Sequence, residues 1–186
     1  MKKTTLTIVL ALLCLFKMVR AQEHKIDHTP LKLGDSIPEA IWNTPLQVIN
    51  HPLGNQTITL NDYRGSELII IDFWASNCSP CIKSLNKLDT LEKHFPKMSV
   101  VPVFVYDLLP NAMPTIIRHK WKWPSVVNST LFNMQLFSRY ITGFGNVWIY
   151  RGRLLAIPRP NNITKENIGA VLSNKHVAFQ NLQQLF

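Results

Sequence analysis

The stretch that decides the fold of this 186-residue chain is Ile69-Ile70-Ile71-Asp72-Phe73-Trp74-Ala75-Ser76-Asn77-Cys78-Ser79-Pro80-Cys81-Ile82-Lys83. Its first part belongs to an apolar run without alternation, which is typical of a strand buried on both faces of a sheet. Its second part brings two cysteines, two residues apart, to the start of a helical pattern. The stretch therefore predicts a buried strand over residues 67–74 that carries a cysteine pair to the beginning of a helix.

The residues after the cysteines have the pattern of an amphipathic helix that ends near Pro96. Apolar residues recur there at steps of three and four, and polar residues occupy the other side. The apolar positions are Ile82, Leu85, Leu88, Leu91 and Phe95. Residues 98–106 then form a second apolar strand. A strand, a helix and a strand in this order predict a parallel crossover within one sheet.

Weaker patterns on both sides of this unit add further elements. Turn residues at 52–55 predict an antiparallel hairpin, and Thr164 is a predicted helix N-cap. The expected elements are hairpin strands at 46–50 and 56–60, a short turn at 61–65, a helix at 111–121, a short strand at 125–127, a helix at 131–141, a second hairpin with strands at 146–150 and 153–157, and a helix after 164. Together they predict an α/β protein in which helices cover both faces of a central mixed sheet.

The N-terminus has the layout of a cleaved secretory signal peptide. Lys2 and Lys3 precede an apolar run over residues 6–16, and a cleavage site with small residues ends at Ala21. A membrane anchor is the alternative, but Lys17 interrupts the run before the roughly 18–20 residues that span a bilayer. The signal peptide predicts export to the periplasm or the extracellular space.

A lipid-attached protein is a further alternative, because Cys14 lies in the apolar run. The residue before it is Leu13 rather than a small residue, which argues against this reading. Contact with the membrane is therefore expected only through the signal peptide during export.

The expected organisation is a signal peptide at 1–21, a flexible lead at 22–32, one domain at 33–174 and a tail at 175–186 that is compatible with an extension of the last helix. The signal peptide carries four cations and no acid, so its removal leaves 16 Lys and Arg against 11 acids and lowers the net charge from +9 to +5. It also removes Cys14, so that Cys78 and Cys81 are the two cysteines of the mature chain.

A basic and aromatic stretch at 118–123 is the strongest local signal for nucleic-acid binding. We expect instead a solvated helix end whose tryptophans, Trp121 and Trp123, turn inward. An exported protein does not share a compartment with nucleic acid, so no nucleic-acid partner is expected.

The spacing of the two cysteines fits thiol–disulfide chemistry. A thiolate attacks disulfides, and the N-terminus of a helix lowers the pKa of a thiol placed there. Cys78 is therefore the expected exposed nucleophile, and Cys81, one turn into the helix, the resolving cysteine. Pro80 falls in the first turn, where its missing N–H costs little. The alternatives are an inert structural disulfide and a metal site, for which this pair supplies two ligands of four.

Residues 72–81, Asp-Phe-Trp-Ala-Ser-Asn-Cys-Ser-Pro-Cys, resemble the active site of thioredoxin, within the exported TlpA-like, redoxin-type branch. The early hairpin and the strand around Trp148 are similar to that branch as well. The resemblance implies a thioredoxin fold with an N-terminal β-hairpin extension, and a redox-active Cys78–Cys81 disulfide. It gives Asp72 a role in proton transfer, places Trp74 beside the substrate, and implies no cofactor and no metal.

The chain departs from this family at three places. Asn77 stands where an aromatic residue usually precedes the nucleophile. Phe144 or Gly145 stands where relatives have a cis-proline that holds the substrate backbone, so these two residues are the expected substrate-binding segment. Lys83 and Leu85 replace an acid and a proline after the second cysteine.

The expected function is that of an exported thiol–disulfide oxidoreductase, more specifically a reductase of protein disulfides that draws electrons from a membrane donor. The alternative is a non-catalytic binding or scaffold module that kept the fold, which the loss of the proline favours. A thiol peroxidase is a third reading, but the residues before Cys78 lack the threonine and proline of a peroxide site.

Overall fold

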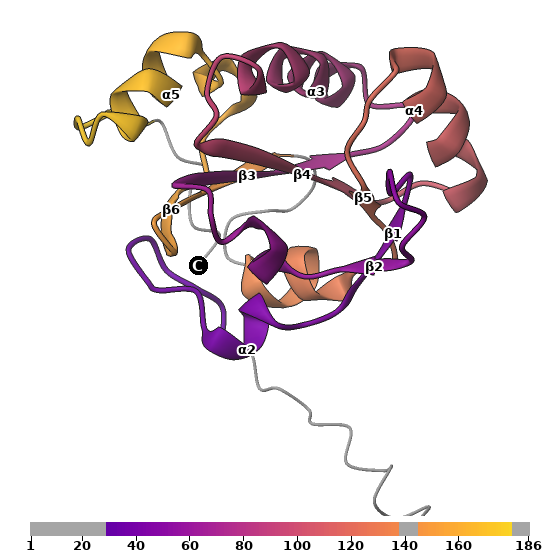
Figure 1. The fold of residues 1–186 in the computed structure, drawn as a ribbon, viewed down its shortest axis with the longest axis horizontal. Helices are drawn as coiled ribbons and strands as arrows, with labels where there is room; N and C mark the ends of the chain where they lie inside the picture. Colours follow the sequence, from indigo (N-terminus) through magenta and orange to yellow (C-terminus); the bar gives the residue numbers. More distant parts are fainter. Residues whose placement is uncertain (1–28, 138–144, 180–186) are drawn as a thin grey trace, which may run out of the picture.

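The computed structural model describes residues 29–137 and 145–179, which form a seven-stranded mixed sheet with helices on both faces (Figure 1). The strands follow the order β2-β1-β5-β4-β3-β6-β7 across the sheet. They are β1 (Leu46–Ile49), β2 (Thr57–Ile58), β3 (Leu68–Trp74), β4 (Met98–Phe104), β5 (Ser125–Val126), β6 (Asn146–Tyr150) and β7 (Arg153–Ala156). The predicted α/β class and both predicted hairpins are confirmed.

Strand β3 is central, as its sequence predicts. Every one of its residues is buried, and it runs parallel to β4 on one side and antiparallel to β6 on the other. A strand with neighbours on both sides and helices on both faces has no polar surface, which explains its continuous apolar run. Asp72 is the exception within this strand, and it is buried as well.

Helices on the two faces of the sheet bury two separate apolar clusters. On one face lie α3 (Ser79–Glu92), α4 (Ala112–His119) and α5 (Lys165–Leu172), and on the other lie α2 (Glu39–Trp42) and the helix η3 (Leu131–Leu136) (Figure 1). Three short 3₁₀ turns complete the described helices: η1 (Leu60–Tyr63), η2 (Leu109–Asn111) and η4 (Pro160–Asn162).

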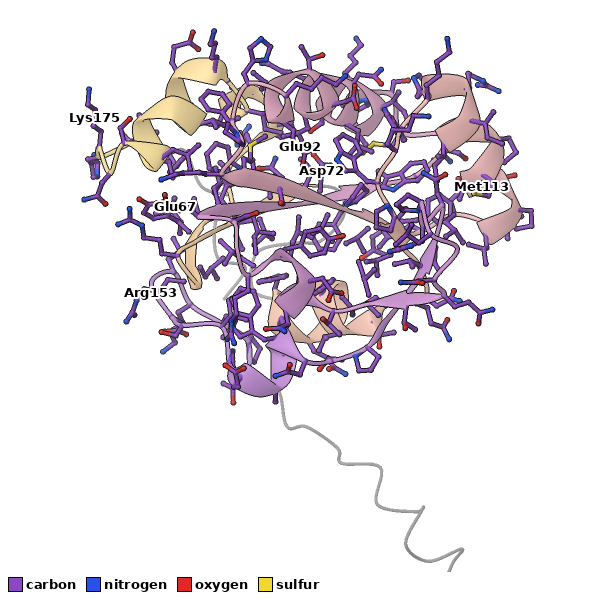
Figure 2. All side chains as sticks on the ribbon, in the orientation of Figure 1. Glu67, Asp72, Glu92, Met113, Arg153 and Lys175 are labelled. Carbon is purple, nitrogen blue, oxygen red and sulfur yellow. A yellow bond between two sulfur atoms is a disulfide. The ribbon has the colours of Figure 1, made fainter. Side chains whose placement is uncertain are left out.

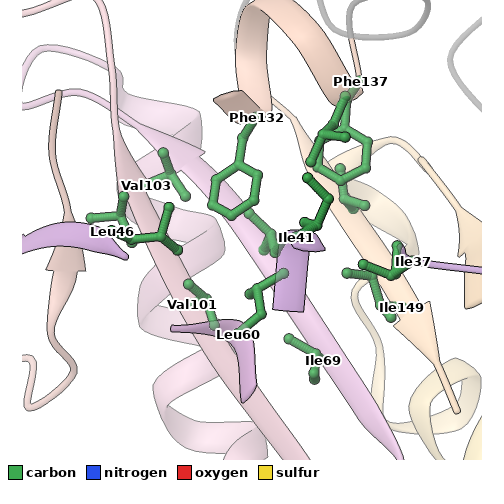
Figure 3. Packing of buried hydrophobic residues seen from close by; sticks show 14 of the residues in the cluster. Ile37, Ile41, Leu46, Leu60, Ile69, Val101, Val103, Phe132, Phe137 and Ile149 are labelled. Atoms are coloured by element: carbon green, nitrogen blue, oxygen red, sulfur yellow. The ribbon is translucent and has the colours of Figure 1, made fainter. Parts of the chain in front are cut away.

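The apolar cluster on the α2 side packs against the face of the sheet opposite to the cysteines. Ile41, Leu60 and Phe132 meet side chains of β3 and β4 there (Figure 3). Phe132 and Phe137 stack with their ring centroids 6.0 Å apart. This cluster includes Leu31, whose amide N–H donates to the carbonyl of Leu136 at 2.9 Å. The packed part of the chain therefore already includes Leu31, although residues 22–32 were expected to be a flexible lead.

Helix α3 begins where the sequence predicts and buries a face that is shifted from the predicted one. Its buried residues are Cys81, Ser84, Leu85, Leu88 and Leu91, whereas Ile82 and Phe95 are only partly buried. The helix therefore turns both a cysteine and a serine towards the sheet.

Two predicted helices differ from the structure. The helix predicted at 131–141 begins as a π-helix over η3, and the Phe137 N–H donates to the carbonyl of Phe132, five residues earlier. Residues 138–144 lie outside the described residues. Helix α5 starts after its predicted cap, where Thr164 Oγ1 accepts from the Asn167 N–H at 3.1 Å, but it ends at Leu172. Residues 175–179 do not extend it, and Phe179 packs against Trp148 instead.

The turn between β6 and β7 fixes the register of the second hairpin. Arg151 and Gly152 both have positive φ, 47° and 75°, as a type I′ turn requires. No helix among the described residues has the length and apolar character that crossing a membrane demands.

Candidate active site

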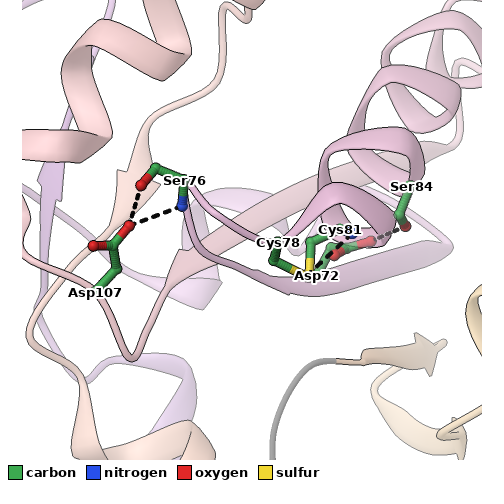
Figure 4. The surroundings of a disulfide bond; sticks show 6 residues. All are labelled: Asp72, Ser76, Cys78, Cys81, Ser84 and Asp107. Carbon is green, nitrogen blue, oxygen red and sulfur yellow. Dashed lines mark hydrogen bonds between the residues drawn. A yellow bond between two sulfur atoms is a disulfide. The ribbon is translucent and has the colours of Figure 1, made fainter.

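The cysteine pair lies where β3 ends and α3 begins. Cys78 is the N-cap of α3, and its Sγ accepts the backbone N–H of Cys81 at 3.3 Å. The two Cα atoms are 5.3 Å apart and the sulfur atoms are joined as a disulfide (Figure 4). Cys78 is 8% exposed and Cys81 5%. Cys78 was expected to be the exposed nucleophile, but both cysteines are buried in this oxidised state. The position of Cys78 as the helix cap, rather than its exposure, distinguishes the two sulfurs.

The start of α3 can stabilise a thiolate on Cys78 after reduction. The first N–H groups of a helix have no partner within the helix, and they carry the positive end of its dipole. Pro80 falls in this first turn, as predicted. The N–H of Cys81 that now faces the Cys78 sulfur would donate to the thiolate and favour its formation.

Asp72 lies in β3 behind the cysteine pair. Ser84 Oγ donates to its Oδ2 (Figure 4), and Ser84 lies one turn after Cys81 on the same face of α3. Burial raises the pKa of Asp72 to about 8, and the hydrogen bond from Ser84 lowers the pKa by a smaller amount. The carboxyl is therefore protonated through most of the neutral range and can release or take up a proton beside Cys81.

A second carboxyl holds the loop before Cys78. Asp107, which follows β4, accepts the backbone N–H of Ser76 at 3.0 Å and also the Ser76 hydroxyl (Figure 4). Asn111 Nδ2 donates to its other oxygen at 2.9 Å. The hydrogen bonds from Ser76 and Asn111 lower the pKa of Asp107. An ionised Asp107 therefore fixes the cysteine loop to the end of the neighbouring strand.

Sequence reasoning missed Ser84, Ser76 and Asp107. Ser84 had a usable signal, because a serine at position i+3 from Cys81 shares the face of the helix that the cysteine occupies. Asp107 had none in its local sequence, since it meets Ser76 only because β3 and β4 are neighbours.

Trp74 is fully buried at the end of β3. Its Nε1–H donates to Ser125 Oγ at 3.0 Å, and its ring meets Phe104 and Trp121 edge to face. Trp121 is buried and Trp123 partly buried, so the tryptophans of the basic stretch do turn inward. A direct contact between Trp74 and a substrate stays a prediction.

Gly145 lies opposite Phe73 of β3, next to Asp72. Its carbonyl accepts the N–H of Phe73 at 2.9 Å, and the next residue, Asn146, pairs with Asp72. Phe144 lies outside the described residues. The role of both residues in substrate binding stays a prediction.

The site has no arrangement for a metal ion within residues 29–137 and 145–179. No group of three or more His, Cys, Asp or Glu side chains comes together there. Lys83, the other departure next to the cysteines, is exposed.

Comparison with known proteins finds likeness at the level of structure. No protein-family model matches the chain, and no curated protein matches it. Among solved structures, the thioredoxin domain of a thiol–disulfide oxidoreductase from Bacteroides vulgatus matches with a TM-score of 0.58 at 18% identity, covering 78% of this chain and 99% of that one. The fold is that of thioredoxin.

Two further structures extend this comparison. A thiol:disulfide interchange protein from Bacteroides sp. matches with a TM-score of 0.56 at 17% identity, over 77% of this chain and 90% of that one. A secreted Mycobacterium tuberculosis disulfide oxidoreductase matches with a TM-score of 0.56 at 8% identity, over 72% and 99%. At these identities the likeness establishes the thioredoxin fold, and the chemistry has to be argued from the site.

Proposed function

We propose that the protein is an exported thiol–disulfide oxidoreductase that reduces disulfides in other proteins. The observation that carries this proposal is the Cys78–Cys81 pair at the N-terminus of α3 with the buried carboxyl of Asp72 behind it. Solved structures of the same fold carry the names of thiol–disulfide enzymes, and one of them is called secreted. Export itself rests on the signal-peptide pattern of the first 21 residues.

In the proposed reaction the reduced pair attacks a substrate disulfide. The Cys78 thiolate forms a mixed disulfide with one substrate sulfur, and the other substrate sulfur leaves as a thiolate that takes up a proton. The Cys81 thiol then loses its proton and attacks Cys78. This step releases the second substrate thiolate, forms the Cys78–Cys81 disulfide, and transfers two electrons to the substrate in total. A membrane donor would then return two electrons and two protons to the pair.

The surroundings of the cysteine pair support a protein that reduces substrate disulfides rather than one that forms them. A strongly oxidising pair needs a highly stabilised thiolate in its reduced form. Here the helix N-terminus is the described stabiliser of the Cys78 thiolate, and the buried Asp72 behind the cysteines adds no positive charge to it. The reduced pair should therefore donate its electrons readily.

An exposed apolar patch beside the site supports a protein as the substrate. It comprises Tyr106, Leu108, Leu109, Met113 and Ile117, of which Leu108 is 74% and Ile117 66% exposed. Figure 2 labels Met113 on the outer side of α4. The patch adjoins Asp107, which holds the cysteine loop, and a cavity of about 390 Å³ opens between the end of β4 and the residues after β5. An apolar segment of an unfolded or extended protein would fit this surface.

Charges on the patch should weaken the binding of protein substrates selectively. We expect the double variant Leu108→Glu/Ile117→Glu to raise the KM for reduction of insulin about tenfold, because loss of two apolar contacts costs on the order of 1.4 kcal/mol. The rate with a small disulfide such as oxidised glutathione should not change. Leu53→Glu, which charges an exposed leucine between β1 and β2, is the control for an added charge elsewhere on the surface. Equal effects on both substrates would contradict a role of the patch in binding.

The proposed function is tested by two measurements on the wild-type protein. It should accelerate the reduction of insulin by dithiothreitol, and the same protein with both thiols alkylated should not. The reduction potential of the pair should be about −250 mV, in the range of reducing thioredoxins, whereas a value above about −150 mV would assign it to the oxidants. If insulin reduction is no faster than with the alkylated protein, the oxidoreductase proposal is wrong, and the alternative of a non-catalytic binding module is the function that is left.

A further inference from the structure

Asn146 is the first residue of β6 and is completely buried. It pairs with Asp72 across the antiparallel ladder. Because the Phe73 N–H donates to the Gly145 carbonyl, Phe73 and Gly145 form a hydrogen-bonded pair, and Asp72 and Asn146 form the next, non-hydrogen-bonded one. Opposite side chains approach each other most closely at such pairs. The Asn146 side chain therefore lies on the α3 side of the sheet, next to the Asp72 carboxyl.

The orientation of the Asn146 amide is fixed by Trp148. The Trp148 indole Nε1–H donates to Asn146 Oδ1 at 2.7 Å. An indole N–H can only donate, so the amide must turn its oxygen to Trp148 and its NH₂ group away from it. This NH₂ group has no hydrogen-bond partner in the described part of the chain. A buried donor without an acceptor costs about 1–3 kcal/mol and calls for an explanation.

Asp72 has the complementary deficit. A carboxylate can accept about four hydrogen bonds, and Ser84 supplies the one recorded for this side chain among the described residues. Among the described residues, those that face it from the neighbouring elements include the disulfide and Ser84 on α3 (Figure 4), Pro102 on β4 and Asn146 on β6. No charged side chain contributes to the pKa of Asp72. An acceptor that lacks donors therefore lies beside a donor that lacks an acceptor.

We propose that Asn146 is a positioning residue for proton transfer at the cysteine pair, whose NH₂ group donates to Asp72 whenever that carboxyl is ionised, while Trp148 holds the amide in the donating orientation. The inference rests on the proposed function. In the second step of exchange, the ionised Asp72 takes the proton of the Cys81 thiol, and the resulting thiolate attacks Cys78. The leaving substrate thiolate then takes the proton that Asp72 holds, so the substrate departs as a thiol and the carboxyl returns to its ionised form. Asn146 and Ser84 together stabilise the ionised carboxyl that this step requires.

The titration of Asp72 in the oxidised protein tests this role directly, followed through its carboxyl ¹³C chemical shift. Asn146→Leu removes the donor, and we expect the Asp72 pKa to rise by about one, a tenfold loss of ionisation. Asn146→Thr keeps a donor and should leave the pKa within about 0.3 of the wild-type value. Ser84→Ala is the positive control, because the Ser84 hydrogen bond lowers the Asp72 pKa.

Trp148→Phe provides a second variant should Asn146→Leu not fold. It removes the indole donor and frees the amide to rotate, so the Asp72 pKa should again rise. A merely structural role of Asn146 would lower the melting temperature without moving this titration, and an unchanged titration in either folded variant would overturn the proposal. The readout needs no disulfide exchange. If the wild-type protein fails to reduce insulin while the titration moves as expected, the proposed function fails and the Asn146–Asp72 hydrogen bond stands.

Discussion

Asp72→Asn should raise the free energy of unfolding of the oxidised protein at pH 8 by about 3 kcal/mol. The folded state holds the proton of Asp72 up to about pH 8, whereas an unfolded chain releases it near the ordinary value of 3.8. Such a shift corresponds to roughly 5–6 kcal/mol. The buried amide of the variant reduces the gain by about 2 kcal/mol, because its donors lack partners.

The same shift gives the pH dependence its sign. Between about pH 4 and pH 8 the folded state binds one more proton at Asp72 than the unfolded state does, so the wild-type protein loses stability as the pH rises through this window. Below the pKa of Asp72 in the unfolded chain, both states hold the proton, so the contribution of Asp72 to the free energy of unfolding is fully present and no longer changes with pH. The variant should lose most of this slope, and Glu92, whose pKa burial also raises, should leave a smaller slope of the same sign.

Urea unfolding of both proteins at pH 5, 6, 7 and 8 checks this, with the disulfide kept intact so that no thiol titrates. Asp89→Asn is the matched control, since it makes the same change on the more exposed side of α3, where Asp89 pairs with Lys93. This control should stay within about 0.5 kcal/mol of the wild type. A wild-type protein as stable at pH 8 as at pH 5 would contradict the buried, protonated state of Asp72.

The elements with strong local patterns were predictable from the sequence. The unbroken apolar run of β3, the period of α3 and the turn at Arg151 and Gly152 each have one physical reading, and the structure contains all three. Strand β5 was placed along the chain but not in the sheet, because two residues with a parallel neighbour on one side and an antiparallel one on the other leave no mark in the sequence. The helix predicted from residue 131 is present as a π-helix over η3, a type that apolar spacing does not distinguish from an α-helix.

The site was predictable only where it is contiguous in sequence. The stretch from Asp72 to Cys81 supplies the strand end, the helix cap and both sulfurs. Asp107 and Asn146 enter through neighbouring strands, at sequence separations of 31 from Ser76 and 74 from Asp72. Neither has a special residue type or spacing, so strand order and register decide their place. A buried carboxyl in an apolar run is still a signal that such partners exist, because a buried polar group without hydrogen bonds is costly even when it is protonated.

Cys81→Ser should convert the protein into a trap that stays attached to its substrates. Without the resolving sulfur, the mixed disulfide on Cys78 can be released only by an external thiol, so it should accumulate. We expect more than half of the reduced variant to form a covalent adduct with an excess of a disulfide-containing protein, against a few per cent for the wild type. The adduct is measured on non-reducing gels, and mass spectrometry should locate it on Cys78.

Cys78→Ser is the matched control for this trap, because it keeps the fold and one sulfur but removes the cysteine at the helix cap. Cys81 lies one turn inside α3 and not at its cap, so this variant should form at least tenfold less adduct and should not accelerate insulin reduction. Equal trapping by both variants would mean that the helix cap does not select the nucleophile. No adduct with Cys81→Ser, together with no insulin reduction by the wild type, would identify a binding module that kept the thioredoxin fold. The pair of variants therefore separates the two functions that this site can support.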